Sequence, residues 1–295
     1  MLMSFSDFKK RSQNSLGDLT SKLEAMNKKD SYKDDRFWRP ELDSSSNGYA
    51  VVRFLDTAKD EDMPFVKYYS HGFQGPGGWY IENSRTTFGE KDPVSEMNSK
   101  LWNTGAESDK DIARQRKRRT NFVSNIMVIS DPANPSNEGK VFLYRYGQKI
   151  HNKIIEVMQP EFQDEEPVNP FDMWKGADFK LKIRKVSGFI NYDKSEFASP
   201  SPLLEGNDDA LERIWNQQYP LNEFIDPSNY KSYDDLKSRL NEVLGNDIRL
   251  TMNENKTKDN IETAEIKEDV PNTESSDSVD ASDALSYFEK LASED

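Results

Sequence analysis

The sequence predicts an α+β protein with a small β-barrel core and helical insertions, flanked by a basic N-terminal arm and a disordered acidic C-terminal tail. Short runs of aromatic and β-branched residues, separated by turns rich in glycine and proline, indicate strands between residues 49 and 186. Helical segments fall between these strands without the regular alternation of a doubly wound sheet. Charges are segregated, with cations concentrated early and acids at the end.

The predicted strands lie at residues 49–55, 64–69, 79–81, 121–129, 141–146 and 179–186. Gly75-Pro-Gly-Gly78 predicts a turn before the third strand, and Asp131-Pro-Ala-Asn-Pro135 with Asn137-Glu-Gly139 predicts one between the fourth and fifth. Helical stretches are predicted at residues 110–119, 149–158, 208–217 and 233–244.

Composition excludes several classes of protein. The 295-residue chain has no cysteine and two histidines, His71 and His151, so disulfides and thiolate metal sites are ruled out and no metal cofactor is expected. No apolar stretch approaches the roughly 18 residues of a membrane span, and residues 1–13 lack the apolar region of a signal peptide. We therefore expect a soluble, non-secreted protein without a membrane partner.

The net charge of −13 is unevenly distributed along the chain. Residues 253–295 contain thirteen acidic residues and four lysines, so they carry −9 and the preceding residues carry −4. Their low apolar content predicts disorder. We therefore divide the chain into an arm at residues 1–25, a core at 26–250 and a tail at 251–295.

The two flanking segments each contain an apolar pattern. In the arm, leucines at three- and four-residue spacing follow Lys9, Lys10 and Arg11, which favours a short amphipathic helix, with a frayed terminus as the alternative. In the tail, apolar residues at three-residue steps form a candidate partner-binding helix, although chance clustering gives the same pattern. These tail residues are Leu285, Phe288 and Leu291.

Six cations lie within ten residues, directly before the predicted strand at 121–129. They are Lys110, Arg114, Arg116, Lys117, Arg118 and Arg119. Such a run can simply be the solvated face of a helix. However, single-stranded nucleic acid requires cations for its phosphates and aromatic rings for its bases, and both are present nearby. The aromatic residues are Trp102, Phe122, Phe142, Tyr144, Tyr146, Phe189 and Tyr192, and the neighbouring cations are Arg53, Arg145, Lys182, Arg184 and Lys185. About half of these rings should face the core.

Catalytic patterns are weak. Acidic pairs such as Asp92 with Glu96 occur in charged, turn-like segments and are expected by chance among 53 acidic residues. The chain has neither a phosphate-binding Gly-Lys-Ser loop nor a nucleophile elbow. A metal-dependent nuclease is the alternative, which a magnesium-dependent cleavage assay would reveal. We therefore predict a non-enzymatic protein.

A series of motifs, in order, extends over most of the core. They are Asn47-Gly-Tyr-Ala-Val-Val-Arg-Phe-Leu55, Ser70-His-Gly-Phe73, Gly78-Trp-Tyr-Ile-Glu82, Leu101-Trp-Asn-Thr104, Lys117-Arg-Arg-Thr120 with Asn125, Asp131-Pro, Asn137-Glu-Gly-Lys-Val-Phe142, Tyr144-Arg145, Trp174-Lys-Gly-Ala177 and Val186-Ser-Gly-Phe-Ile-Asn-Tyr-Asp193. Each is weak alone, but the ordered series resembles the single-stranded DNA-binding proteins of T-even-type phages.

This resemblance implies an OB-type β-barrel that coats single-stranded DNA cooperatively during phage replication, recombination and repair, in the cytoplasm of the infected bacterium. It implies phosphate contacts at Lys117, Arg118 and Arg119. Base-stacking roles are implied for Trp102, Phe122, Tyr144, Phe189 and Tyr192. The arm motif Lys9-Lys-Arg-Ser12 would mediate self-association. The tail would bind phage replication and recombination proteins, namely polymerase, helicase loader and recombination mediator, and a scaffold with secondary DNA binding is the alternative. RNA is a further possible ligand.

The same resemblance implies one departure. The best-studied members hold zinc with one histidine and three cysteines. Here His71 corresponds to the histidine, but Ser84 and residues 94–97 stand where the thiols would be. We therefore expect that this chain has lost the metal and holds the region by packing or hydrogen bonds.

Overall fold

The computed structural model describes residues 34–162 and 164–245. The chain divides into two units, residues 1–37 and 38–295. In the first, the described segment is a turn in which the Phe37 N–H donates to the carbonyl of Asp34. The predicted arm and tail lie outside the described residues, so roles for their side chains stay predictions. This applies to Lys9, Lys10, Arg11, Ser12, Leu285, Phe288 and Leu291.

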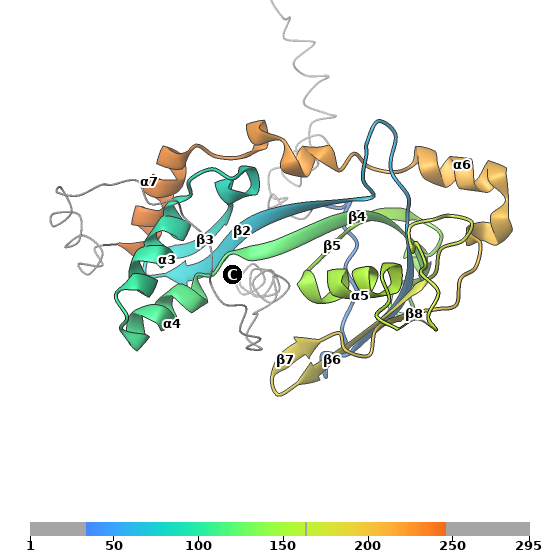
Figure 1. Cartoon of the computed structure of the whole chain (residues 1–295), viewed down its shortest axis with the longest axis horizontal. Helices are drawn as coiled ribbons and strands as arrows, with labels where there is room; N and C mark the ends of the chain where they lie inside the picture. The colour runs from blue at the N-terminus through green and yellow to red at the C-terminus, as the bar shows by residue number, and fades with distance from the viewer. Residues whose placement is uncertain (1–33, 163, 246–295) are drawn as a thin grey trace, which may run out of the picture. The chain divides into compact units, whose positions relative to one another are not determined.

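The second unit is built on an antiparallel sheet that curls into a half-barrel (Figure 1). Its strands are β1 (Gly48–Phe54), β2 (Phe65–Gly75), β3 (Gly78–Asn83), β4 (Arg119–Ser130), β5 (Val141–Tyr146), β6 (Phe179–Val186), β7 (Phe189–Asn191) and β8 (Glu196–Phe197). The order is β3-β2-β4-β1-β6-β7, with β5 paired to β4 and β8 paired to β6. The α+β class is confirmed. Among the described strands the ladder ends at β3 and β7, so closure into an OB-type barrel stays a prediction.

Helices connect and cover the strands. They are α3 (Pro93–Asn103), α4 (Glu107–Gln115), α5 (Gln148–Met158), α6 (Asp208–Asn216) and α7 (Tyr233–Leu244), with short 3-10 turns η1 (Arg85–Phe88), η2 (Pro135–Asn137), η3 (Leu203–Gly206), η4 (Asn222–Ile225) and η5 (Pro227–Asn229). In Figure 1, α3, α4 and α7 gather at the β3 end of the long strands β2 and β4, while α5 lies beside β4. Among the described residues, no helix combines the length and apolar composition that crossing a bilayer requires.

Three apolar clusters hold these elements together. The main core lies between the sheet and α5, and it includes Phe54, Phe122 and Tyr146. A second cluster joins the β2–β3 hairpin to α3, α4 and α7. A third lies under α6. The second cluster contains few strand residues, so the hairpin and its three helices form a module attached to the main sheet through β2 and β4.

The β2–β3 turn shows why this module is rich in glycine. Gly78 has a φ of +109°, which side chains other than glycine rarely adopt. The Gly77 N–H donates to the carbonyl of Val243 at 2.8 Å, and a Cβ on Gly77 would lie 2.0 Å from the carbonyl oxygen of Glu242. The turn therefore approaches the end of α7 at a distance that only glycine allows.

The predicted elements compare well with the structure. All six predicted strands are present, and so are the helices predicted at 149–158, 208–217 and 233–244. The helix predicted at 110–119 is wrong at its end, because α4 stops at Gln115 and Arg119 already begins β4. Helix α3 was not predicted, although Asp92 and Pro93 form a strong start signal: the Asp92 carboxylate accepts from the N–H groups of Val94 and Ser95.

Candidate nucleic-acid interface

One face of the sheet is aromatic and covered by a helix at one end, and polar and exposed at the other. Residues paired across antiparallel strands share a face, and Lys67 of β2 pairs with Phe122 of β4, which pairs with Tyr146 of β5. Helix α5 covers this face at the aromatic end, where Phe122 stacks on His151 with ring centroids 3.7 Å apart. Lys67 is exposed and Tyr69, two residues further along β2, is half-buried. The face therefore runs from a covered aromatic core to a more open end.

The open end carries a cluster of cations around one ring. The guanidinium of Arg118 lies 3.9 Å from the centroid of the Tyr69 ring, and the ammonium of Lys67 lies 5.3 Å from it. We call Lys67, Tyr69 and Arg118 the cation–aromatic cluster. Such an arrangement can neutralise a phosphate and offer a π-face beside it. Lys67 and Tyr69 were not predicted as site residues, although the alternation Phe65, Lys67, Tyr69 in a predicted strand was the available signal.

Four of the six cations, Arg116 to Arg119, lie in the connection from α4 to β4 and at the first residue of β4, and we call these four residues the basic run. Arg116 caps α4, and Lys117 and Arg118 lead into β4 at Arg119. The guanidinium of Arg116 lies 5.4 Å from the ring centroid of Phe73, and Nη2 of Arg119 donates to the carbonyl of Gly72 at 2.9 Å. The basic run is thus fixed along β2, and Arg118 lies against the ring of Tyr69.

Lys110 and Arg114 lie on α4, against the ring of Trp102. Their cationic groups are 5.8 Å and 5.5 Å from the centroid. Arg114 also pairs with Glu107 and Asp111, and these hydrogen bonds, Glu107 first, raise the pKa of the guanidinium. Because acidic neighbours on the same helix offset its charge, Arg114 contributes less net positive charge here than the sequence suggested.

Arg53 requires a correction. Its side chain is 1% exposed, and its Nε donates to the carboxylate of Asp178 at 2.8 Å while Nη2 donates to the carbonyl of Ser201 at 2.8 Å. These contacts tie β1 to the segments before and after β6. Because the guanidinium is buried and donates its hydrogen bonds to these acceptors, we assign Arg53 a structural role and remove it from the expected DNA contacts.

Phe122 and Tyr144 also lie inside the core. They are 2% and 5% exposed, and Tyr144 packs edge-on against Trp38 at 5.4 Å. Neither ring presents a face to a base in this structure. Tyr144 and Tyr146 do share a face, as expected from their spacing, with centroids 5.6 Å apart. These residues form the interior that supports the cation–aromatic cluster.

The remaining predicted residues lie on two different faces. Arg145 pairs in register with Val123, so it points away from the face of Tyr144 and Lys67. On the β6–β7 hairpin, Phe189 is 43% exposed, while Tyr192 packs partly against the main core. Figure 1 shows this hairpin on the same side of β4 as α5. Phe189 is therefore the predicted stacking residue whose ring is most accessible.

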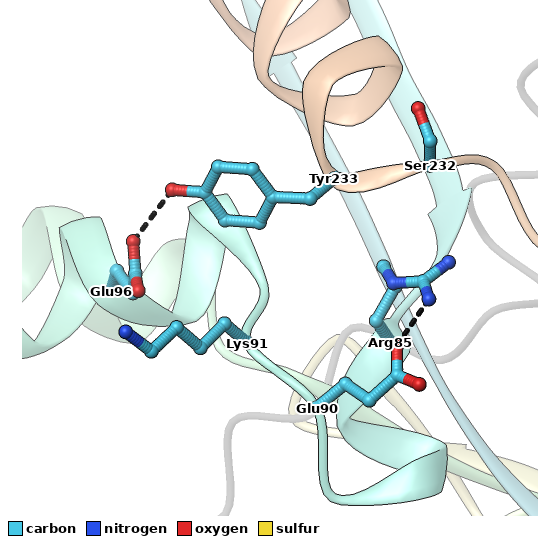
Figure 2. Close-up of a pocket in the computed structure, with 6 residues that line it drawn as sticks. All are labelled: Arg85, Glu90, Lys91, Glu96, Ser232 and Tyr233. Carbon is cyan, nitrogen blue, oxygen red and sulfur yellow. Dashed lines mark hydrogen bonds and ion pairs between the residues drawn. The ribbon is translucent and has the colours of Figure 1, made fainter.

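A shallow cavity of about 640 Å³ lies elsewhere, between α3, η1 and the start of α7 (Figure 2). The Tyr233 hydroxyl donates to Glu96 at 2.7 Å, which with burial raises the pKa of Tyr233 to about 12. Arg85 pairs with Glu90. Opposite charges are matched inside the cavity, and none of the predicted contact residues lines it. We do not place the interface there.

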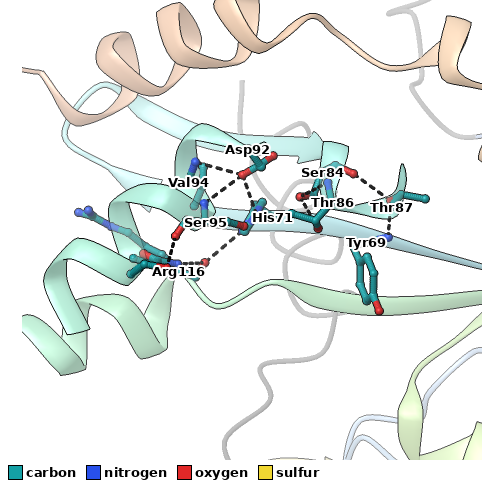
Figure 3. Close-up of polar contacts among 11 residues, drawn as sticks. Tyr69, His71, Ser84, Thr86, Thr87, Asp92, Val94, Ser95 and Arg116 are labelled. Carbon is teal, nitrogen blue, oxygen red and sulfur yellow. Dashed lines mark hydrogen bonds and ion pairs between the residues drawn. The ribbon is translucent and has the colours of Figure 1, made fainter. Parts of the chain in front are cut away.

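His71 lies in a hydrogen-bonded cluster that does not suit zinc (Figure 3). Its Nε2 is 3.2 Å from Oδ1 of Asp92, and its Nδ1 is 3.2 Å from the carbonyl oxygen of Arg116. The buried Ser84 hydroxyl contacts the hydroxyl of Thr86 at 3.0 Å. Within the described ranges, no three His, Asp or Glu side chains gather as metal ligands, whereas structural zinc requires four. The residues present do not fit the ion.

A curled antiparallel sheet with cations and aromatic rings on one open surface is the arrangement typical of nucleic-acid-binding half-barrels and barrels. The family model described as gp32 DNA binding protein like matches residues 46–244. The chain belongs to this family of DNA-binding proteins.

Named relatives agree with this assignment. The single-stranded DNA-binding protein of Enterobacteria phage T4 is 38% identical over 244 residues, covering 81% of this chain and 79% of that protein. The protein of the same name from Enterobacteria phage T2 is also 38% identical, covering 81% of this chain and 80% of its own length. The single-stranded DNA-binding protein of Escherichia phage SV14 is 41% identical over 101 residues. The family consists of binding proteins, in agreement with the prediction that the chain is not an enzyme.

Proposed function

We propose that this protein binds single-stranded DNA with little sequence preference and coats it during phage DNA replication, recombination and repair in the infected host. The observation that carries the proposal is the cation–aromatic cluster at the open end of the sheet face. Phosphates would contact Lys67, Lys117 and Arg118, and bases would stack on Tyr69 and Phe189. These contacts need no base-edge recognition, because every base has a π-face.

A salt titration tests this proposal directly. Binding of an oligo-dT and of a matched duplex is measured by fluorescence anisotropy across a range of salt concentrations. Neutralisation of phosphates on single strands predicts a log–log slope of about −0.7 for each contact. We expect tighter binding to oligo-dT and a steep slope. Equal affinity for the duplex, or a flat slope, would contradict the proposal.

The N-terminal arm is proposed to link neighbouring protomers on DNA through Lys9, Lys10, Arg11 and Ser12. Deleting residues 1–20 should leave the affinity for a short oligonucleotide nearly unchanged and remove cooperativity on long strands, because only long strands hold two protomers. The measurement is a pair of binding isotherms, on a short and a long oligo-dT. Equal losses on both lengths would show that the arm contacts DNA itself.

The acidic tail is proposed to compete with DNA for the cationic surface and, once displaced, to recruit replication proteins. Residues 253–295 carry a net charge of −9. Truncation after Met252 should tighten DNA binding, most strongly at low salt where screening is weakest, and should abolish capture of replication proteins. The double variant Leu285→Ala with Phe288→Ala changes no charge. It should therefore lose the capture of replication proteins, while its tail still competes with DNA for the cationic surface. Unchanged binding and capture after truncation would overturn both roles.

A further inference from the structure

The cluster around His71 joins three parts of the helical module that are distant in sequence. His71 lies on β2, Asp92 caps the start of α3, and the carbonyl of Arg116 ends α4. His71 and Asp92 are each 1% exposed. The Arg116 carbonyl also accepts from Nδ2 of Asn98 at 3.0 Å. Buried His71 and half-buried Asn98 therefore both contact the carbonyl oxygen of Arg116, the first residue of the basic run.

The imidazole ring of His71 has an oxygen atom beside each of its two nitrogens. Each ring nitrogen faces an oxygen that can accept a hydrogen bond: Oδ1 of Asp92 lies 3.2 Å from Nε2, and the Arg116 carbonyl oxygen lies 3.2 Å from Nδ1. Burial by itself raises the pKa of Asp92, but the hydrogen bond and charge of His71, with the Ser95 N–H, hold it below its usual value. The carboxylate also caps α3, where the helix dipole favours negative charge.

The cluster is directly connected to the proposed DNA contacts. Beyond the Arg116 carbonyl, the Arg119 guanidinium bonds to Gly72, the neighbour of His71 on β2, and Arg118 stacks on Tyr69. The backbone of Tyr69 is fixed as well, because its N–H donates to the Thr87 hydroxyl at 3.0 Å and its carbonyl accepts from the Ser84 N–H at 2.8 Å. The run and the ring are thus held by the same cluster.

We propose that the contacts of His71 with Asp92 and with the Arg116 carbonyl, which we call the His71 clasp, do the work of a structural metal in this chain. The clasp fixes the start of the basic run against β2, and so His71 and Asn98 are positioning residues for Arg118. This inference rests on the proposed function, since it explains how the phosphate-binding cation is held. It also requires that the module binds no zinc.

A double-mutant cycle tests the positioning role on the full-length chain. Binding to oligo-dT is titrated with salt for the wild type, Arg118→Ala, His71→Leu and His71→Leu with Arg118→Ala. In the wild type, Arg118→Ala should reduce the slope by about 0.7, the value for one phosphate contact. With His71→Leu the slope should already be reduced, and adding Arg118→Ala should change it little. If the two effects add fully, the clasp does not position Arg118.

Matched variants separate positioning from general loss of stability. Asp131→Asn changes another carboxylate that is 1% exposed and bonds Trp38 and Asn137 at the β4–β5 turn. We expect it to lower the melting temperature and leave the Arg118 effect intact. His71→Gln keeps an N–H donor and should restore part of the slope. If His71→Leu does not fold, Asn98→Ala removes the second donor to the same carbonyl and replaces it in the cycle. A full Arg118 effect in that background overturns the proposal.

Metal addition supplies an independent readout. The melting temperature of the wild type is measured with zinc chloride and with EDTA, and bound zinc is counted by elemental analysis. We expect no shift and no stoichiometric zinc, because the clasp occupies both nitrogens of His71. A zinc-dependent rise in melting temperature would overturn the proposal. If the wild type itself fails to bind oligo-dT, the proposed function fails, whereas normal wild-type binding with additive effects in the cycle rejects the clasp alone.

Discussion

Replacing Lys67, Lys117 and Arg118 together by alanine is expected to weaken binding to oligo-dT by roughly two orders of magnitude, if each lost contact costs about 1 kcal/mol. The log–log salt slope should become shallower by about 2, since each phosphate contact on a single strand contributes about 0.7. All three residues lie at the surface or at its edge, so the melting temperature should change little. Fluorescence anisotropy at several salt concentrations measures affinity and slope together.

The matched control removes the same charge elsewhere. Lys59, Lys140 and Lys175 are exposed and lie outside the sheet face that carries the cluster. Their triple replacement by alanine lowers the net charge equally, so it should reproduce any long-range electrostatic effect while keeping the slope. Equal slopes for the two triple variants would show that binding depends on net charge alone, and that the cation–aromatic cluster is not the contact surface.

The sheet was predictable because its strands carry local signals. Aromatic and β-branched runs with turn residues between them located β3, β4 and β5 within two residues, whereas the predicted second strand ended at residue 69 and β2 continues to Gly75. The end of α4 was not predictable from the sequence. Arg116 to Arg119 have good helical propensity, and the contacts that hold them outside the helix come from β2. Tertiary contacts overrode local preference there.

The site was only partly predictable, because alternation defines two faces of a strand without saying which is covered. Phe122 and Tyr146 share a face with Lys67, and α5 buries the first two while leaving the lysine exposed. The packing of α5 (Gln148–Met158) against one end of this face decides this. Arg53 shows the same principle, because its partner Asp178 is 125 residues away in sequence. A cation in a strand gives no sign of such a distant partner.

Phe122→Ala and Phe189→Ala are expected to separate core rings from stacking rings. Phe122 is 2% exposed and packs against His151, Tyr146 and Phe65, so its truncation should lower the free energy of unfolding by about 3–5 kcal/mol. Phe189 is 43% exposed, so its truncation should change stability by less than about 0.5 kcal/mol. Denaturant unfolding followed by tryptophan fluorescence measures both values.

For DNA binding, the Phe189→Ala variant should show the larger loss and the Phe122→Ala variant the smaller one. Under conditions where both variants are folded, Phe189→Ala should weaken oligo-dT binding by about 1–3 kcal/mol, the typical value for one lost base stack. Phe122→Ala should bind nearly as well as the wild type per folded molecule, because its ring supports the sheet from inside. Neither variant should alter the salt slope, since neither removes a charge. If folded Phe122→Ala instead loses binding and Phe189→Ala does not, the main core must open for DNA, and the bases then stack on the rings that α5 covers here.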